Sequence, residues 1–234
     1  IPCPLINSPE DRAELVKRLY GIDEMLMVPF DDEMRTTPWD RFVTDILVGR
    51  YGAVHLVAGH DHHFGHKNQG SPELLREKCA ELGLGCDIIP AVTIGGITVS
   101  STHIRKLLEE GDVETARAFL GHPHVLTQTV GHGRQLGRTI GIPTANLVAP
   151  PHVLLPRRGV YAAKITLPDG RAFGGVTNVG VRPTVNNGQD VTVEPWILDF
   201  DGDLYGQAIR VEFFRRLRDE RKFDSLAALR SQIE

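Results

Sequence analysis

The pattern of apolar residues changes near residue 121, and this change most limits the folds open to the chain. Before it, short apolar runs such as Val54 to Ala58 and Asp87 to Val92 alternate with amphipathic helical segments. That alternation is typical of a parallel sheet covered by helices. After it, strand-length segments follow one another with turn signals between them, as in a β-barrel or a small sandwich. We therefore predict two domains, residues 1–121 and 122–234.

Capping residues predict where several helices begin and end. Ser8-Pro9-Glu10-Asp11 reads as a cap, a proline at the first helical position and an acidic first turn, so a helix should run to about Tyr20. Met25 to Phe30 is an apolar run of strand length. By the same criteria we expect helices that begin at Thr37-Pro38, Ser71-Pro72, Ser101 and Asp112, and strands at Val125 to Val130, Val160 to Leu167, Ala172 to Val179, Val191 to Phe200 and Ala208 to Phe214.

Composition argues against several classes of function. A formal net charge of −4 gives no global basic field, so nucleic acid is not an expected partner. No apolar run approaches the roughly 20 residues that cross a bilayer, and the first residues lack the features of a signal peptide. The three cysteines form no C-x-x-C pair and suit a reducing compartment. We therefore expect a cytoplasmic protein with neither a nucleic acid nor a membrane as partner.

Residues 131–146 read G-H-G-R-Q-L-G-R-T-I-G-I-P-T-A-N and combine groups that bind phosphate and metal. The glycines let the backbone approach a ligand closely, and Arg134 and Arg138 bring cations that meet phosphate. Thr144 and Asn146 offer side-chain oxygens to a hard cation such as Mg²⁺. The spacing does not fit the Walker pattern, because no Lys-Ser/Thr pair follows the glycines. Composition alone leaves two interpretations open, a phosphate-and-metal loop or a glycine-rich surface turn with solvated arginines.

The pattern G-x-x-x-G-R-T-x-G-x-P-T-A-N in this stretch resembles the signature of the riboflavin kinases. The resemblance covers nearly all of residues 124–234, including Asn178-Val179-Gly180, Val193-Glu194 and Arg221-Lys222-Phe223. It implies a compact six-stranded barrel with a closing α-helix, which Asp224 can cap. The implied roles are phosphate binding by Gly133, Gly137 and Arg138, Mg²⁺ and ATP binding by Thr144 and Asn146, flavin contact by Arg221 and Phe223, and catalysis by Arg138 with Glu194 as general base. Without the motif, Glu194 would be read as an outward residue of an edge strand.

A second candidate nucleotide site lies in the first half, at V-S-S-T-H-I-R in residues 99–105. Two hydroxyl residues at a helix start aim donors at an anion, and an arginine one turn later adds charge. Taken alone, the stretch is more often a plain helix start, with Ser101 as the N-cap and Arg105 as a solvated helix residue. The stretch resembles the I-S-S-T-x-x-R motif of nucleotidyltransferases related to FAD synthetases. Another motif of that family is similar to Gly59-His60-Asp61 with Phe64-Gly65. The resemblance implies a Rossmann-like α/β domain that transfers AMP from ATP to FMN, with nucleotide binding by Asp61, Ser101, Thr102 and Arg105.

Two departures from that family are visible. His62 stands where the family usually has an aromatic residue. The family's G-x-F-D-G-x-H-x-G-H loop, whose histidines contact the triphosphate, does not occur in these 234 residues. We therefore expect the adenylyltransferase domain to be N-terminally truncated as given, since an open parallel sheet without its first strands would expose an edge and an apolar face. The alternative is a kinase-only enzyme with a remnant N-terminal domain.

Other classes of function remain as alternatives. The crowded histidines at 60, 62, 63 and 66 match no tetrahedral zinc spacing, which favours a solvated loop. A non-catalytic flavin- or nucleotide-binding regulator would keep the glycines without needing Glu194. A barrel that binds single-stranded RNA would need interleaved aromatics, and aromatic content is only 6%. The expected function is phosphorylation of riboflavin to FMN with ATP and Mg²⁺, and in the complete protein adenylylation of FMN to FAD with release of pyrophosphate.

Overall fold

The computed structural model describes residues 3–131, 144–183 and 189–221 of the chain. These residues form two compact units. The first combines Ile1–Met25 with Ser100–Glu234, and the second is Leu26–Val99. The first unit is therefore discontinuous in sequence, because residues on both sides of the second unit contribute to it.

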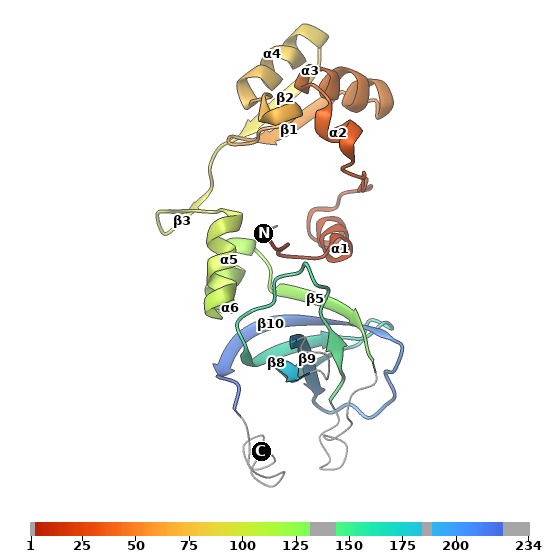
Figure 1. Ribbon diagram of the computed structural model, residues 1–234, viewed down its shortest axis with the longest axis vertical. Coiled ribbons are helices and arrows are strands. Elements are labelled where there is room, and N and C mark those ends of the chain that lie inside the picture. Colours follow the sequence, from red (N-terminus) through yellow and green to blue (C-terminus); the bar gives the residue numbers. More distant parts are fainter. Residues whose placement is uncertain (1–2, 132–143, 184–188, 222–234) are drawn as a thin grey trace. The chain divides into compact units, whose positions relative to one another are not determined.

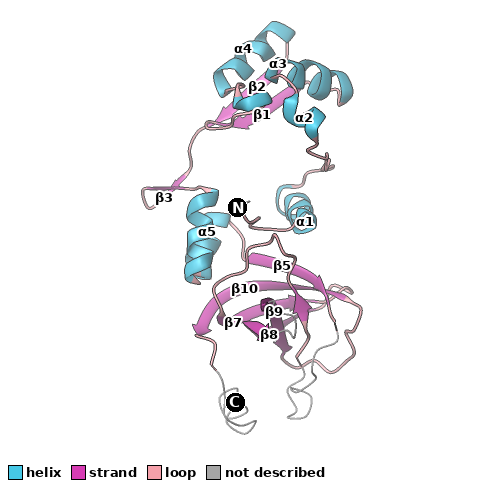
Figure 2. Cartoon of the chain, in the orientation of Figure 1, coloured by secondary structure: helices cyan, strands magenta, loops and turns pink. Residues whose placement is uncertain are grey.

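A six-stranded antiparallel sheet forms the centre of the first unit (Figures 1 and 2). The strands pair in the order β5-β10-β7-β8-β9-β6, and a bridge between Gly131 and Asn146 links the two edges of the sheet. The result is a nearly closed barrel, which confirms the six-stranded architecture. The strands are β5 (His124–Thr129), β6 (Leu147–Val148), β7 (Gly159–Thr166), β8 (Ala172–Pro183), β9 (Gln189–Ile197) and β10 (Ala208–Arg218).

The barrel interior is filled by alternate residues of its strands. The rings of Tyr161 and Phe213 meet edge to face at 5.6 Å and both are fully buried. Gly175 on β8 has no room for a side chain, because a Cβ there would collide with Ile165 and lie 2.5 Å from the carbonyl oxygen of Trp196. Close packing inside the barrel therefore explains why glycine stands at position 175.

The helix predicted after Ser8 is confirmed as α1 (Pro9–Tyr20). Ser8 Oγ accepts a hydrogen bond from the backbone N–H of Asp11 at 3.0 Å. The buried Asp11 carboxylate in turn accepts the N–H of Thr127 on β5 at 3.2 Å. Together with an ion pair of 2.5 Å between Glu14 and Arg210 of β10, these contacts fix α1 on the barrel.

Two further helices of the first unit are α5 (Ser101–Glu110) and α6 (Val113–Leu120). Asp112 caps α6, as predicted, with its carboxylate accepting the N–H of Thr115 at 2.9 Å. Both helices bury one apolar face, and α6 packs against β10. The buried residues of the two helices are Ile104, Leu107, Leu108, Val113, Ala116 and Phe119.

The second unit is an α/β unit around two parallel strands, β1 (His55–Gly59) and β2 (Gly85–Ile89). The predicted parallel pairing is therefore confirmed. Its core contains Val43, Phe64, Leu75 and Cys79. The other elements of the unit are α2 (Asp32–Thr36), α3 (Trp39–Arg41), a π-helix η1 (Phe42–Arg50), a 3₁₀ turn η2 (His66–Asn68), α4 (Pro72–Leu82), and the short strands β3 (Thr93–Ile94) and β4 (Ile97–Thr98).

One predicted strand is wrong. Met25 to Phe30 adopts neither helix nor strand, and Leu26 and Phe30 are largely exposed. No strand in the described residues pairs with this segment, so its apolar residues have no sheet to join. In the described part of the chain, no helix is long and apolar enough to span a membrane. The predicted closing helix lies outside the described residues, as Asp224 does.

Candidate active site on the barrel

The strand β9 presents two different faces. Val193 and Ile197 are buried in the barrel interior. Glu194, which alternates with them, lies on the other face and is half-buried. Directly opposite Glu194 on β8 is Asn178. Because opposite residues of an antiparallel pair point to the same side, the carboxylate and the amide are neighbours on that face.

The segment that contains Thr144 and Asn146 pairs with β9 on its other side. Leu147 pairs with Val193, and an isolated bridge joins Thr144 to Trp196. The N–H of Ala145 donates to the carbonyl oxygen of Pro195 at 2.9 Å, which continues the same register. This register brings Asn146 opposite Glu194.

Thr144, Asn146, Glu194 and Asn178 consequently share one face of three adjacent strands, and we call them the polar row. Asn146 is only 6% exposed, and its carbonyl oxygen accepts the N–H of Gly131 at 2.8 Å, so its backbone is fixed on both sides. A hydroxyl, amide oxygens and a carboxylate are ligands that Mg²⁺ accepts, and a carboxylate can also take a proton. The polar row therefore combines a cation-binding set with a candidate base.

Thr192 supports the candidate base from two residues away on β9. Its hydroxyl, which is almost fully buried, donates to Glu194 Oε1 at 3.4 Å. The sequence did not single out Thr192 or Asn178 as site residues. The i, i+2 spacing of Thr192 and Glu194 gives a sequence signal for the first, whereas Asn178 depends on the register between β8 and β9.

The remaining predicted residues of the kinase site fall in different places. Arg221 is described and exposed, three residues beyond the end of β10. Gly133, Gly137, Arg138 and Phe223 lie outside the described residues.

The second motif opens α5. Ser100, and not Ser101, is the N-cap, since its hydroxyl accepts the N–H of His103 at 3.2 Å. Ser101 and Thr102 are exposed in the first turn. Arg105, one turn later, donates its Nε–H to the carbonyl oxygen of Pro4 at 2.9 Å, which orients the guanidinium. The helix start thus gathers two hydroxyls, backbone donors and a cation, a set that suits an anion.

Asp61 belongs to the second unit, where it follows β1 and is exposed. His60 Nδ1 lies 3.9 Å from its carboxylate. His62, which replaces the family's aromatic residue, stacks on the buried Phe64 with 5.8 Å between the ring centroids. Among the described residues, no three His, Cys, Asp or Glu side chains form a group that could hold a metal ion.

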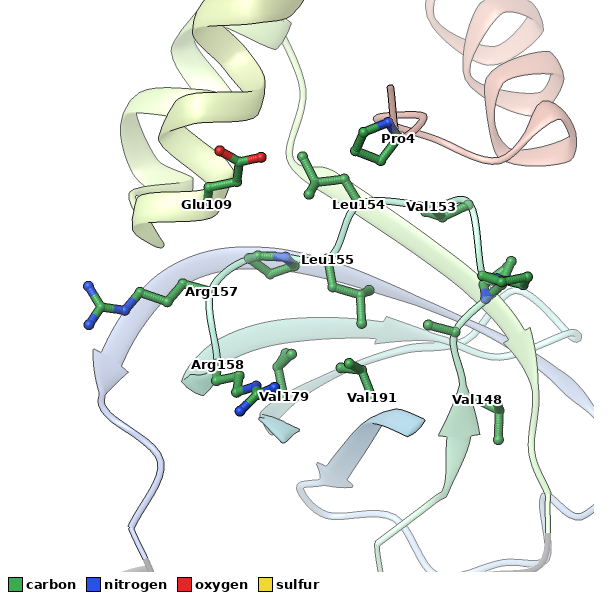
Figure 3. Close-up of a pocket in the computed structure, with 14 residues that line it drawn as sticks. Pro4, Glu109, Val148, Val153, Leu154, Leu155, Arg157, Arg158, Val179 and Val191 are labelled. Carbon is green, nitrogen blue, oxygen red and sulfur yellow. The ribbon is translucent and has the colours of Figure 1, made fainter. Parts of the chain in front are cut away.

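A cavity of about 540 Å³ lies beside β8, β9 and the connection between β6 and β7 (Figure 3). Val179 and Val191 line it, and they alternate with the residues of the polar row's face. Pro4, from the segment before α1, Val148 of β6 and Leu154 of the connection between β6 and β7 also line it. None of the four residues of the polar row lines the cavity, although Val148, which lies on the same face as that row, does.

Two family models match the chain. Residues 120–234 match the model described as riboflavin kinase, and residues 2–103 match the model described as FAD synthetase. A bifunctional riboflavin kinase/FMN adenylyltransferase of Pseudomonas fluorescens is 37% identical over 213 residues, which cover 91% of this chain and 68% of that protein. The protein of the same name from Bacillus subtilis (strain 168) is 33% identical over 235 residues, which cover 100% of this chain and 73% of the relative.

Among solved structures, one titled macrolide-efflux protein from Streptococcus pneumoniae superimposes with a TM-score of 0.82. It is 32% identical in sequence, and the match covers 97% of this chain and 72% of the other. The shared fold therefore extends over both compact units.

Proposed function

This chain belongs to the family of bifunctional riboflavin kinase/FMN adenylyltransferases, and from that membership we propose how its residues carry the family's two reactions. The barrel phosphorylates riboflavin to FMN with ATP. The residues of the FAD synthetase match contribute to the adenylylation of FMN to FAD, with release of pyrophosphate. Riboflavin, FMN and ATP are the substrates, and the cytoplasm is the compartment where these reactions take place.

Glu194 is the general base of the kinase reaction. Its carboxylate accepts the proton of the ribityl 5′-hydroxyl while that oxygen forms a bond to the γ-phosphorus of ATP. The bond between the γ-phosphorus and the bridging oxygen breaks, and ADP leaves. The hydrogen bond from Thr192 supports this role because it orients the carboxylate, and Asn178 lies opposite Glu194 on β8.

Thr144 and Asn146 are the residues that would hold Mg²⁺ with the ATP phosphates. The fit rests on their donor chemistry and on their common face with Glu194. When bound, the cation neutralises charge on the β- and γ-phosphates. Gly133, Gly137 and Arg138 are proposed to complete phosphate binding, and Arg221 and Phe223 to contact the flavin, on the strength of the family motif.

For the adenylyltransferase reaction we assign the anion-binding start of α5. Ser101, Thr102 and Arg105 bind phosphate oxygens and stabilise charge on the departing pyrophosphate. The bond from Arg105 Nε to the carbonyl oxygen of Pro4 supports this assignment, since it orients a cation one turn into α5. Asp61 is the proposed nucleotide contact of the second unit.

The observation that carries the kinase proposal is the placement of Asn146 opposite Glu194 on adjacent strands. The test is chromatography of flavins after incubation of the protein with riboflavin, ATP and Mg²⁺. We expect FMN to form only when all three are present. Tight riboflavin binding without conversion would instead favour the non-catalytic regulator.

A further inference from the structure

We propose that Glu220 is a second carboxylate of the kinase site and that it binds the inner hydroxyl groups of the ribityl side chain of riboflavin. The inference rests on the proposed function and adds a substrate-recognition residue to it. Three features carry it: the position of Glu220 over β8, the anchoring of the residues before it, and the order of groups across the site.

Glu220 lies directly over Gly180. Gly180 is two residues beyond Asn178 on β8 and pairs with Thr192 of β9. It therefore lies on the face that carries Asn178 and Glu194. A Cβ placed on Gly180 would collide with the Glu220 carboxylate and would lie 3.0 Å from Asn178 Nδ2. The carboxylate of Glu220 and the amide of Asn178 are therefore neighbours on the face of the polar row, and glycine at 180 keeps that place open.

The chain just before Glu220 is fixed by the end of β10. Arg216 donates to the Asp219 carboxylate at 2.5 Å and to the carbonyl oxygen of Arg158 at 3.0 Å. Arg218 donates to the carbonyl oxygen of Asp219 at 3.0 Å. These bonds determine where the chain leaves the barrel, and so they direct Glu220 over β8. Glu220 itself is exposed and accessible to a ligand.

The groups of the site follow a fixed order across the strands. The proposed cation ligand Asn146 immediately precedes β6, Glu194 is on the adjacent strand β9, and Glu220 lies over β8, the strand after that. In phosphoryl transfer the attacking and leaving oxygens are roughly in line, so the acceptor approaches from the side away from the nucleotide. With ATP on the side of Asn146 and the 5′-hydroxyl at Glu194, the rest of the ribityl chain extends over β8 towards Glu220.

The chemistry of Glu220 suits that chain. An ionised carboxylate is an acceptor only, and the inner ribityl hydroxyls are donors. Among the described residues, no hydrogen bond or ion pair to the Glu220 carboxylate is found. The carboxylate can therefore accept from the substrate without breaking a contact within the described part of the protein.

The test compares two flavins in three proteins. The flavins are riboflavin and an analogue that keeps the terminal hydroxyl but has hydrogens in place of the inner hydroxyls. The proteins are the wild type, Glu220→Gln and the control Glu114→Gln, which removes the same charge from an exposed residue on α6. Binding is measured by quenching of flavin fluorescence, and KM and kcat are measured for riboflavin and for MgATP.

We expect Glu220→Gln to weaken riboflavin binding about tenfold or more, as for a hydrogen bond to a charged group. The KM for MgATP should stay unchanged, and the variant should bind the two flavins alike. The Glu114→Gln variant should behave as the wild type. An equal loss for both flavins, unchanged riboflavin binding, or a raised Mg²⁺ requirement with unchanged flavin affinity would each overturn the inference.

Failure of the proposed function gives a different result. A wild-type protein that neither binds nor phosphorylates riboflavin would overturn both proposals together. A wild type that binds and turns over riboflavin, beside an unaffected Glu220→Gln variant, would overturn only the role of Glu220.

Discussion

Acid should destabilise the barrel through one buried histidine, His124 at the start of β5. Its side chain is fully buried, its ring stacks on Phe213, and its Nε2 is 3.1 Å from the carbonyl oxygen of Leu154. In the described part of the chain its Nδ1 has no hydrogen-bond partner. Burial, and to a lesser extent the nearby His122, lowers the pKa of His124 from 6.5 to about 4.

The direction of the effect follows from this lowered pKa. Between pH 6.5 and pH 4 the unfolded chain binds a proton at His124 that the folded barrel excludes, so stability is present above pH 6.5 and is lost as the pH falls. The shift lowers the free energy of unfolding by about 2 kcal/mol between pH 7.5 and pH 5, and by about 3 kcal/mol between pH 7.5 and pH 4.

The assay is urea unfolding at pH 7.5 and pH 5, followed by tryptophan fluorescence. The chain has two tryptophans, of which Trp196 lies in the barrel and Trp39 in the second unit. A Trp39→Phe background therefore confines the signal to the barrel. In that background, the free energy of unfolding of the His124→Gln variant should fall by about 2 kcal/mol less between pH 7.5 and pH 5 than that of the protein with His124. An equal loss in both proteins would refute the assignment to His124.

Two further predictions concern the base and the barrel packing. Glu194→Gln should keep ATP and riboflavin binding but lower kcat by about 10²- to 10⁴-fold in a flavin phosphorylation assay, with Glu114→Gln as a control at the wild-type rate; near-normal turnover would exclude Glu194 as the base. Gly175→Ala should destabilise the barrel by about 1–3 kcal/mol in urea unfolding, because the added methyl group would collide with Ile165 and with the carbonyl oxygen of Trp196. Gly174→Ala, where a Cβ meets only ordinary van der Waals contact, should change stability by less than about 0.5 kcal/mol. Equal effects of the two alanines would contradict the packing argument.

Local signals predicted the helices well. The cap at Ser8 and the cap at Asp112 act within one turn of helix, so the residues that decide each start are adjacent in the sequence. The strand predicted from the apolar run Met25 to Phe30 is wrong, because a strand needs a distant pairing partner and the run itself does not specify one. The two-residue strand β6 is too short to show any periodicity.

The candidate site was predictable only in part. Thr144, Asn146 and Glu194 were identified from the family motif, and the register of β6, β9 and β8 then places them on one face. Asn178 belongs to a segment that matches the family, but sequence reasoning assigned it no role in the site, because only the pairing of strands brings it to Glu194. Glu220 reaches the same face after residues that Arg216 anchors. Arg216 makes a local bond to Asp219 and a non-local bond to the carbonyl oxygen of Arg158, and sequence spacing does not encode the second.

The discontinuity of the first unit has a consequence for synthesis on the ribosome. Leu26–Val99 is contiguous, so it can fold as soon as it has emerged. Helix α1 precedes that unit in the sequence, yet its partners on the barrel, Thr127 and Arg210, follow the unit and are translated after it. Residues 9–20 therefore cannot dock on the barrel, and Leu15 cannot be buried as it is in the folded protein, until β10 has been translated. During that interval the apolar face of this segment stays exposed, and transiently exposed apolar surface promotes aggregation.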